Sequence, residues 1–323
     1  MKKVLKPYKR AALFCLLAMT ALVSCKKDDG LSSRELLVYV AGDYSRVDNR
    51  VVTPFVHNPV SITGSRMTGF AAYATREVPA DIDVTFTADA SLVADFNQKN
   101  GTAFLPLPAA NYRIVNPGKY KIKAGTVKSD SLQIEILNPG QLTDPKGYLL
   151  PFTITAIEGQ DKGAAISTNQ RTVYLNVTYE FNNVLPGQAP AAGTAMSRTG
   201  WSVTVSNTTS GALGPAMIDG NNSTAWRSSN TASAAKWAIV NIASQKTVSS
   251  FLMVPNYVTT TENATQITVS SSNDNTNWTV QGIWRGTGPA TGTTAAAPDV
   301  KGINFASPVT AQYFRLEINT WVS

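Results

Sequence analysis

The stretch Pro215–Ser229, PAMIDGNNSTAWRSS, is the part of the sequence that decides the fold. Within six positions it carries the oxygen-bearing side chains of Asp219, Asn221, Ser223 and Thr224, interrupted by Gly220. A hard cation such as Ca²⁺ takes about six to eight oxygen ligands, which a short polar loop can supply from side chains and carbonyls. The same residue types also form Asx-rich turns that hold no metal. Spacing alone leaves both interpretations open.

The N-terminus has the pattern of a secretion signal. Five basic residues precede an apolar run, 11–23, that is much shorter than the roughly 20 residues of a membrane-spanning helix. The run ends in Leu22-Val23-Ser24-Cys25, which resembles the lipobox of bacterial lipoproteins. That resemblance implies a signal peptide over 1–24, lipidation at Cys25 and a tether over 25–34. An ordinary signal with an incidental cysteine is the alternative.

The residues after Cys25 bear on localisation. Lys26-Lys27-Asp28-Asp29 resembles the acidic tags that send lipoproteins to the outer face of the outer membrane in Gram-negative glycan-utilisation systems. The resemblance implies a lipid-anchored outer-membrane protein exposed at the cell surface, which contacts the membrane through its anchor only. A charged, solvated tether is the simpler alternative.

Charge and residue counts exclude several classes of function. The chain has 28 Lys and Arg and 21 Asp and Glu residues, and five of the basic residues precede position 25. The remaining 23 basic and 21 acidic residues leave a net charge of +2, so we expect no nucleic-acid partner. With Cys15 in the signal and Cys25 at the lipid site, no disulfide or cysteine nucleophile is expected. His57 is the sole histidine, which excludes a paired-histidine mechanism, and we expect it in a loop.

The region 35–181 has the pattern of a β-sandwich. Leu36–Val40 is an apolar run, 81–88 alternates with Ile82, Val84 and Phe86 on one face, and 172–179 alternates as well. Leu92, Val93 and Phe96 share one face of a short helix that ends at Asn100-Gly101.

Several phrases of this region resemble one family. They are Phe96-Asn97, Asn100-Gly101-Thr102, Leu107-Pro108, Tyr112, 122–125, 129–136 and Tyr148-Leu149-Leu150-Pro151. The family is the immunoglobulin-like N-terminal domain of unknown function found in lipoproteins of glycan-utilisation loci. The resemblance implies an immunoglobulin-like fold and carries no catalytic residues.

A linker and a second all-β domain follow. Residues 182–196 are rich in Pro, Gly, Asn and Ala, which is typical of a linker. From 197 to 323, strand-like runs recur at 237–242, 251–254, 267–271, 278–283 and 312–318. In the last run, Phe314, Leu316 and Ile318 alternate with polar neighbours, as expected for a β-sandwich or jelly roll.

The second domain resembles a well-known family. The phrases are the 216–226 loop, Trp237-Ala238-Ile239-Val240-Asn241-Ile242, the 271–278 turn and Ala311-Gln312-Tyr313-Phe314-Arg315-Leu316-Glu317-Ile318. They are similar to the coagulation factor 5/8 type C, or discoidin, domain, which includes the family 32 carbohydrate-binding modules. The chain differs in having few residues after the last strand, ending at Trp321-Val322-Ser323.

This resemblance implies a structural Ca²⁺ in the opening loop. The matching ligand positions are Ala216, Asp219, Asn221 and Thr224, together with Leu316 and Glu317 from the last strand. Two carboxylates with neutral oxygens suit a hard dication, and such an ion would tie a loop to a strand distant in sequence.

A sugar site needs an aromatic face for the ring and polar groups for the hydroxyls. Tyr257 follows Pro255-Asn256 and precedes a threonine-rich loop, so we expect it at a strand end as the platform. Asn256, Arg227 and Asn230 are the expected hydrogen-bond partners. A polar surface loop without a ligand is the alternative.

Taken together, the sequence predicts a non-catalytic cell-surface lipoprotein that binds glycan and delivers it to neighbouring outer-membrane uptake proteins. The first alternative is an adhesion protein that binds host protein or lipid head groups, for which 211–214 is a mild candidate. The second is a glycoside hydrolase, which needs two carboxylates about 5–10 Å apart in a cleft. The five carboxylates of the second domain, two of them expected on the metal, make an enzyme the weaker interpretation.

Overall fold

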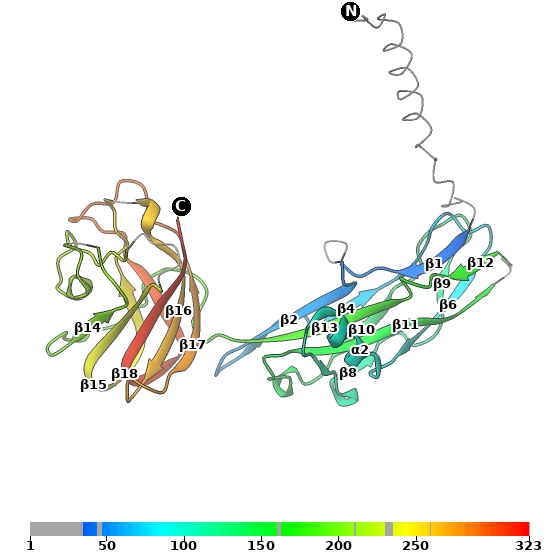
Figure 1. The fold of residues 1–323 in the computed structure, drawn as a ribbon, viewed down its shortest axis with the longest axis horizontal. Helices are drawn as coiled ribbons and strands as arrows, with labels where there is room; N and C mark the ends of the chain where they lie inside the picture. The colour runs from blue at the N-terminus through cyan, green and yellow to red at the C-terminus, as the bar shows by residue number, and fades with distance from the viewer. Residues whose placement is uncertain are drawn as a thin grey trace, which may run out of the picture.

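The structure is a computed structural model that describes residues 35–43, 47–159, 163–209, 211–229, 235–258 and 260–322. The expected signal peptide, the lipidation site Cys25 and the sugar-site candidate Asn230 lie outside these residues. The described chain forms two β-rich domains joined by one segment (Figure 1), which confirms the all-β prediction. No helix among the described residues is both long and apolar enough to span a membrane.

The first domain contains thirteen of the strands. They are β1 (Leu36–Val40), β2 (Arg50–His57), β3 (Ile62–Thr63), β4 (Met67–Phe70), β5 (Ala72–Ala74), β6 (Ile82–Ala88), β7 (Leu105–Pro106), β8 (Tyr112–Ile114), β9 (Tyr120–Ile122), β10 (Leu132–Ile136), β11 (Tyr148–Gly159), β12 (Ala164–Ile166) and β13 (Thr172–Phe181). The largest sheet has the order β3-β2-β13-β11-β6-β9, with β7 also paired to β11. Two three-stranded sheets, β12-β1-β5 and β4-β10-β8, complete the domain.

The core of this domain follows the alternation predicted from the sequence. Ile82, Val84 and Phe86 of β6 are buried, because alternate residues of a strand face the same side of the sheet. The ring centroid of Phe70 lies 5.4 Å from that of Phe86 and 5.3 Å from that of Phe152. Helix α2 (Leu92–Asn100) buries Val93 and Phe96 and ends at Gly101, whose φ of 62° is the left-handed conformation that glycine adopts readily.

His57 is placed differently from the expectation. It lies in strand β2, not in a loop, and it is buried with its ring edge-on to Tyr179, at 4.7 Å between centroids. Burial lowers its pKa, because the cationic form would lose hydration there. The flanking prolines suggested a loop, but Pro54 lies inside the strand and Pro59 lies beyond its end.

The second domain is a five-stranded sheet in the order β14-β15-β18-β16-β17. Its strands are β14 (Ser202–Val205), β15 (Trp237–Met253), β16 (Ala264–Ser272), β17 (Thr279–Arg285) and β18 (Lys301–Trp321), with short 3₁₀ turns at Gly214–Met217 and Thr260–Glu262. Phe314 is fully buried on the core face of β18, and Leu316 and Ile318 pack on the same cluster. On the other face, the Arg315 guanidinium lies 5.3 Å from the centre of the Trp237 ring.

The expected linker is not a free tether in its first part. Asn183 and Val184 are buried, and Val184 belongs to the hydrophobic core of the second domain. The Asn183 side chain accepts a hydrogen bond from the Ser307 amide and donates one to the Ser307 carbonyl, both at 2.9 Å. Residues 182–189 therefore dock on β17 and β18, although their composition is that of a linker.

Asn182 connects the two domains directly. Its backbone N–H donates to the His57 carbonyl of the first domain at 2.8 Å, and its side-chain oxygen accepts from the Ile283 amide of β17 at 3.0 Å. A longer ion pair, 3.8 Å between Arg285 and Glu180, crosses the same boundary. These contacts define an interdomain joint at residues 180–184.

Candidate functional site

The oxygen-rich loop folds on itself around one carboxylate. Asp219 accepts a hydrogen bond from the Asn221 amide at 2.8 Å and one from the Thr224 hydroxyl at 2.6 Å. The Thr224 hydroxyl bond and the Asn221 amide bond lower the Asp219 pKa, aided by the charge of Arg198. Gly220 has a φ of 83°, so it supplies the tight turn that this wrapping requires. The result is a short loop with an ionised carboxylate at its centre.

The predicted calcium ligands fall into two groups. Asp219, Asn221 and Thr224 share this loop, and Ala216 lies in the preceding 3₁₀ turn. Leu316 and Glu317 lie in β18, where Glu317 is opposite Trp237 and Thr268 and pairs with Arg315 at 3.3 Å. Among the described residues, no hydrogen bond or ion pair joins the two groups, nor do three or more His, Cys, Asp or Glu gather at one point. The oxygens of the loop suit a hard cation, whereas the contribution of β18 stays a prediction.

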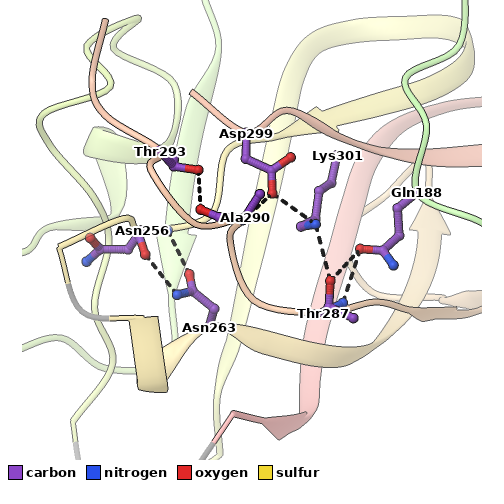
Figure 2. A network of polar contacts seen from close by, with 8 residues as sticks. All are labelled: Gln188, Asn256, Asn263, Thr287, Ala290, Thr293, Asp299 and Lys301. Carbon is purple, nitrogen blue, oxygen red and sulfur yellow. Dashed lines mark hydrogen bonds and ion pairs between the residues drawn. The ribbon is translucent and has the colours of Figure 1, made fainter. Parts of the chain in front are cut away.

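The loop between β15 and β16 carries two of the sugar-site candidates. The Asn256 amide donates to the Asn263 side-chain oxygen at 2.6 Å, and the Asn263 side chain donates back to the Asn256 carbonyl at 2.8 Å (Figure 2). Asn263 is buried, so this exchange fixes the base of the loop. Tyr257, half-buried, follows at once, in the loop four residues beyond the end of β15 at Met253.

Arg227 joins the same loop through an ion pair. Its guanidinium donates two hydrogen bonds to the Glu262 carboxylate, and this pairing raises the Arg227 pKa. Both side chains are more than a third exposed, so the pair contributes little to stability but defines an orientation. Because Glu262 precedes Asn263, Arg227 lies beside the loop that holds Asn256 and Tyr257. Three of the four predicted residues thus lie in or beside this loop, at one end of the domain.

A cavity next to this loop includes residues that the sequence reasoning missed. It has a volume of about 380 Å³ and is lined by Thr287–Thr291, Lys301 and Val322. The Lys301 side chain is only 9% exposed, and its ammonium nitrogen lies 3.1 Å from Asp299 and 3.4 Å from the Thr287 hydroxyl (Figure 2). The Val322 amide donates to the Asn263 carbonyl at 2.9 Å, which places the cavity beside the 256–263 loop. The segment 287–299 has no aromatic residue, so nothing local marked it.

The carboxylates of the second domain are all engaged. Glu262 pairs with Arg227, Glu317 with Arg315 and Asp299 with Lys301. The Asp299 pKa is lowered first by the Ala290 amide bond and then by Lys301, and amide bonds from the turn at Asn277 lower that of Asp274. A glycosidase needs one carboxylic acid whose pKa is raised so that it can donate a proton. The pKa shifts of Asp299 and Asp274 run in the opposite direction.

Comparison with family models gives a separate match in each of the two domains. A model described as an N-terminal domain matches residues 32–161, and the F5/8 type C domain model matches residues 202–323. A comparison with curated proteins found no match.

Solved structures include one with both domains. A two-domain protein of unknown function from Bacteroides fragilis is 16% identical, with 99% of this chain and 95% of that chain covered and a TM-score of 0.61. At this identity the likeness establishes the fold alone. A CBM32 module of a family 31 glycoside hydrolase from Clostridium perfringens is 17% identical over 40% of this chain and 86% of its own, with a TM-score of 0.34. A chitosan-binding module from Paenibacillus sp. IK-5 is 26% identical, with 38% of this chain and 86% of the module covered and a TM-score of 0.30.

Proposed function

Residues 202–323 belong to the F5/8 type C domain family, and from this premise we propose that the protein is a non-catalytic glycan-binding protein. One observation supports the proposal most: the loop that holds Asn256 and Tyr257 is bonded to Arg227 through Glu262 and lies beside a cavity lined by Thr287 and Lys301. An aromatic ring next to fixed amide, hydroxyl and guanidinium groups is the combination that a sugar ring requires. The first domain would hold this end at a distance from the anchor.

Each group has a distinct role in the proposed site. Tyr257 supplies the apolar face for the C–H side of a pyranose, while Asn256 and Arg227 direct hydrogen bonds at its hydroxyls. Asn230, outside the described residues, completes the predicted set. The pairing with Glu262 holds the Arg227 guanidinium in a defined plane, which reduces the conformational entropy lost on binding.

Replacing Tyr257 by alanine is expected to weaken glycan binding about two- to tenfold, since an aromatic contact contributes about 0.5–1.5 kcal/mol beyond the area it buries. A glycan array identifies the ligand, and isothermal titration calorimetry then measures the loss. Tyr313→Ala, which removes an aromatic ring from the outer face of β18, is the matched control and should bind normally. Undiminished binding by Tyr257→Ala, with an unchanged melting temperature, would remove Tyr257 from the site.

We extend the proposal to a structural Ca²⁺ in the Asp219–Thr224 loop. Removing the ion with a chelator is expected to lower the melting temperature of the second domain, because an ion bound only by the folded state at 100 times its Kd stabilises that state by about 2.7 kcal/mol. The Asp219→Ala variant should lose this response while Asp274→Ala retains it. If Ca²⁺ produces neither heat nor a thermal shift in the unmodified chain, the ligand set is incorrect.

We also propose that Cys25 is lipidated and that the protein captures glycan at the cell surface for a neighbouring uptake or degradation system. The lipobox-like ending Leu22–Cys25 supports the anchor. Labelling cells with a radioactive fatty acid should mark the protein, and Cys25→Ala should abolish the label and release the chain from the outer membrane. An unlabelled protein that fractionates with soluble proteins would rule out the anchor.

Exposed apolar side chains favour a second candidate function, adhesion to lipid head groups or host protein. Val258, next to Tyr257, is 75% exposed, and Leu213 in the 211–214 loop is 56% exposed. Such exposed apolar side chains are features of interaction surfaces. Sedimentation with phosphatidylserine vesicles tests this alternative. Co-sedimentation that Val258→Ser abolishes, with no glycan bound on the array, would favour it over carbohydrate.

A further inference from the structure

The other end of the second domain has an unusual strand terminus. Strand β16 ends in three consecutive buried serines, Ser270, Ser271 and Ser272, at 8%, 6% and 5% exposed. Successive residues of a strand face opposite sides, so this burial means that both sides are covered. Ser271 lies opposite Phe314, the core residue of β18, so a hydroxyl occupies a position that an apolar side chain would normally fill.

A recess opens beside these serines. Its volume is about 410 Å³, and Ser271, Asn277, Thr279 and Gln281 line it together with the buried Val309 and Ala311. Val309 and Ala311 supply the apolar part of the lining. The volume falls within the range of about 300–1,000 Å³ that is typical of ligand pockets.

The polar groups of the recess are held in fixed orientations. The Gln281 amide nitrogen donates to the Ser271 hydroxyl at 2.9 Å, and its oxygen accepts from the Asn183 side chain at 3.3 Å. Asn183 is buried in the interdomain joint, so the lining glutamine is oriented by a segment that arrives from the first domain. Groups that are oriented before binding lose little entropy when a ligand arrives.

Charge restricts the kind of ligand. Asp274 is the sole ionisable residue of the lining. Its carboxylate accepts hydrogen bonds from the Thr276 and Asn277 amides, the Asn277 side chain and the Ser272 hydroxyl, so its acceptor capacity is largely used. An anion would meet this negative charge without a compensating cation, and a cation would have to displace several of these bonds. Hydroxyl and amide groups remain for a neutral ligand.

We propose that this recess binds a small neutral polyhydroxylated ligand, such as a single sugar ring, by hydrogen bonds. The site lies at the opposite end of β16 from the 256–263 loop, roughly 25 Å along the strand. It is separate from the site of Tyr257, Asn256 and Arg227 and does not depend on it. Because no aromatic ring lines the recess, the dissociation constant should be about millimolar.

Nuclear magnetic resonance on the ¹⁵N-labelled full chain tests the proposal. D-glucose, D-galactose and N-acetyl-D-glucosamine are titrated separately, with glycerol as a control for non-specific polyol effects. At least one sugar is expected to produce saturable shifts of the side-chain amide signals of Gln281 and Asn277. The proposal is overturned if none of the three sugars does so, or if glycerol produces the same shifts at the same concentration.

Variants separate this site from the proposed glycan site. Thr279→Trp should fill the recess and abolish the Gln281 shifts, whereas Val280→Trp, on the neighbouring exposed residue that does not line the recess, should leave them unchanged. Asn277→Ala should weaken binding at least threefold and serves if Thr279→Trp fails to fold. Tyr257→Ala should leave the Gln281 shifts intact. Retained shifts in Thr279→Trp, or their loss in Tyr257→Ala, would refute a separate recess site.

Discussion

Replacing Gly282 by alanine is expected to lower the free energy of unfolding of the second domain by about 3–4 kcal/mol. The new Cβ would lie 2.0 Å from the side-chain oxygen of Asn182 and 3.0 Å from its Cα. Asn182 cannot retreat without loss, because that oxygen accepts hydrogen bonds from the Ile283 and Val184 amides. The φ of Gly282, 143°, adds backbone strain for any other residue. The substitution should therefore displace the joint and expose Val184.

A second glycine separates the steric overlap with Asn182 from the backbone strain in the expected destabilisation. Gly292 has a φ of 82°, but a Cβ built there meets no atom within 4 Å. Gly292→Ala thus measures the cost of a left-handed backbone alone, about 1 kcal/mol. Urea unfolding followed by tryptophan fluorescence reports the second domain selectively, because all six tryptophans lie between positions 201 and 321. Equal destabilisation by the two substitutions would show that Asn182 is not held in the joint as described.

The joint also has a consequence for the whole molecule. Asn182 bonds the first domain through its backbone and the second through its side chain, and Glu180 reaches Arg285 across the boundary. Inter-domain motion is the default where few contacts cross a boundary. Here the connecting chain is itself part of the second domain, so the joint should hold the two domains in one orientation (Figure 1). If the chain is anchored at Cys25 as proposed, we expect the first domain to act as a rigid spacer.

The strands were predictable because their signal is local. Ile82, Val84 and Phe86 alternate in the sequence, and the pleat of a single strand suffices to place them on one face. The joint was not predictable by the same means. Its Pro, Gly and Asn content is typical of linkers, and only the fold brings Gln281 and Ser307, 98 and 124 residues further on, to the Asn183 side chain.

The candidate site shows the same division between local and distant information. The turn around Asp219 and the loop at Asn256 were predictable, since each is a short stretch with its own turn chemistry. Lys301 and Asp299 were not, because a charged pair next to a threonine-rich loop looks like ordinary surface until the fold buries the lysine. The joint role of Asp219 and Glu317 in binding one ion stays a prediction, since it depends on a meeting of two distant segments.

The other large loss of stability is expected for a substitution in the core of the second domain, at Trp284. Trp284 is 0% exposed and packs in the cluster that contains Val184, Ile267 and Ile303. Its indole N–H donates to the Gly302 carbonyl at 3.0 Å. Trp284→Ala is expected to cost about 3–5 kcal/mol, through the cavity it leaves and the carbonyl it deprives of a partner. Urea unfolding followed by tryptophan fluorescence measures this loss of stability, since five tryptophans remain to report the unfolding of the second domain.

Trp321→Ala is the matched control for the loss of an indole. Trp321 is 40% exposed, and its ring lies 4.8 Å from the Lys236 ammonium. Removing it should cost about 1 kcal/mol or less, because water already reaches the ring and the cation contact is weak at the surface. The loss of stability in Trp284→Phe should lie between those of Trp284→Ala and Trp321→Ala. Phenylalanine refills part of the cavity but does not restore the hydrogen bond to Gly302. A loss at Trp284→Ala no larger than that at Trp321→Ala would mean that β17 does not close the core of this domain.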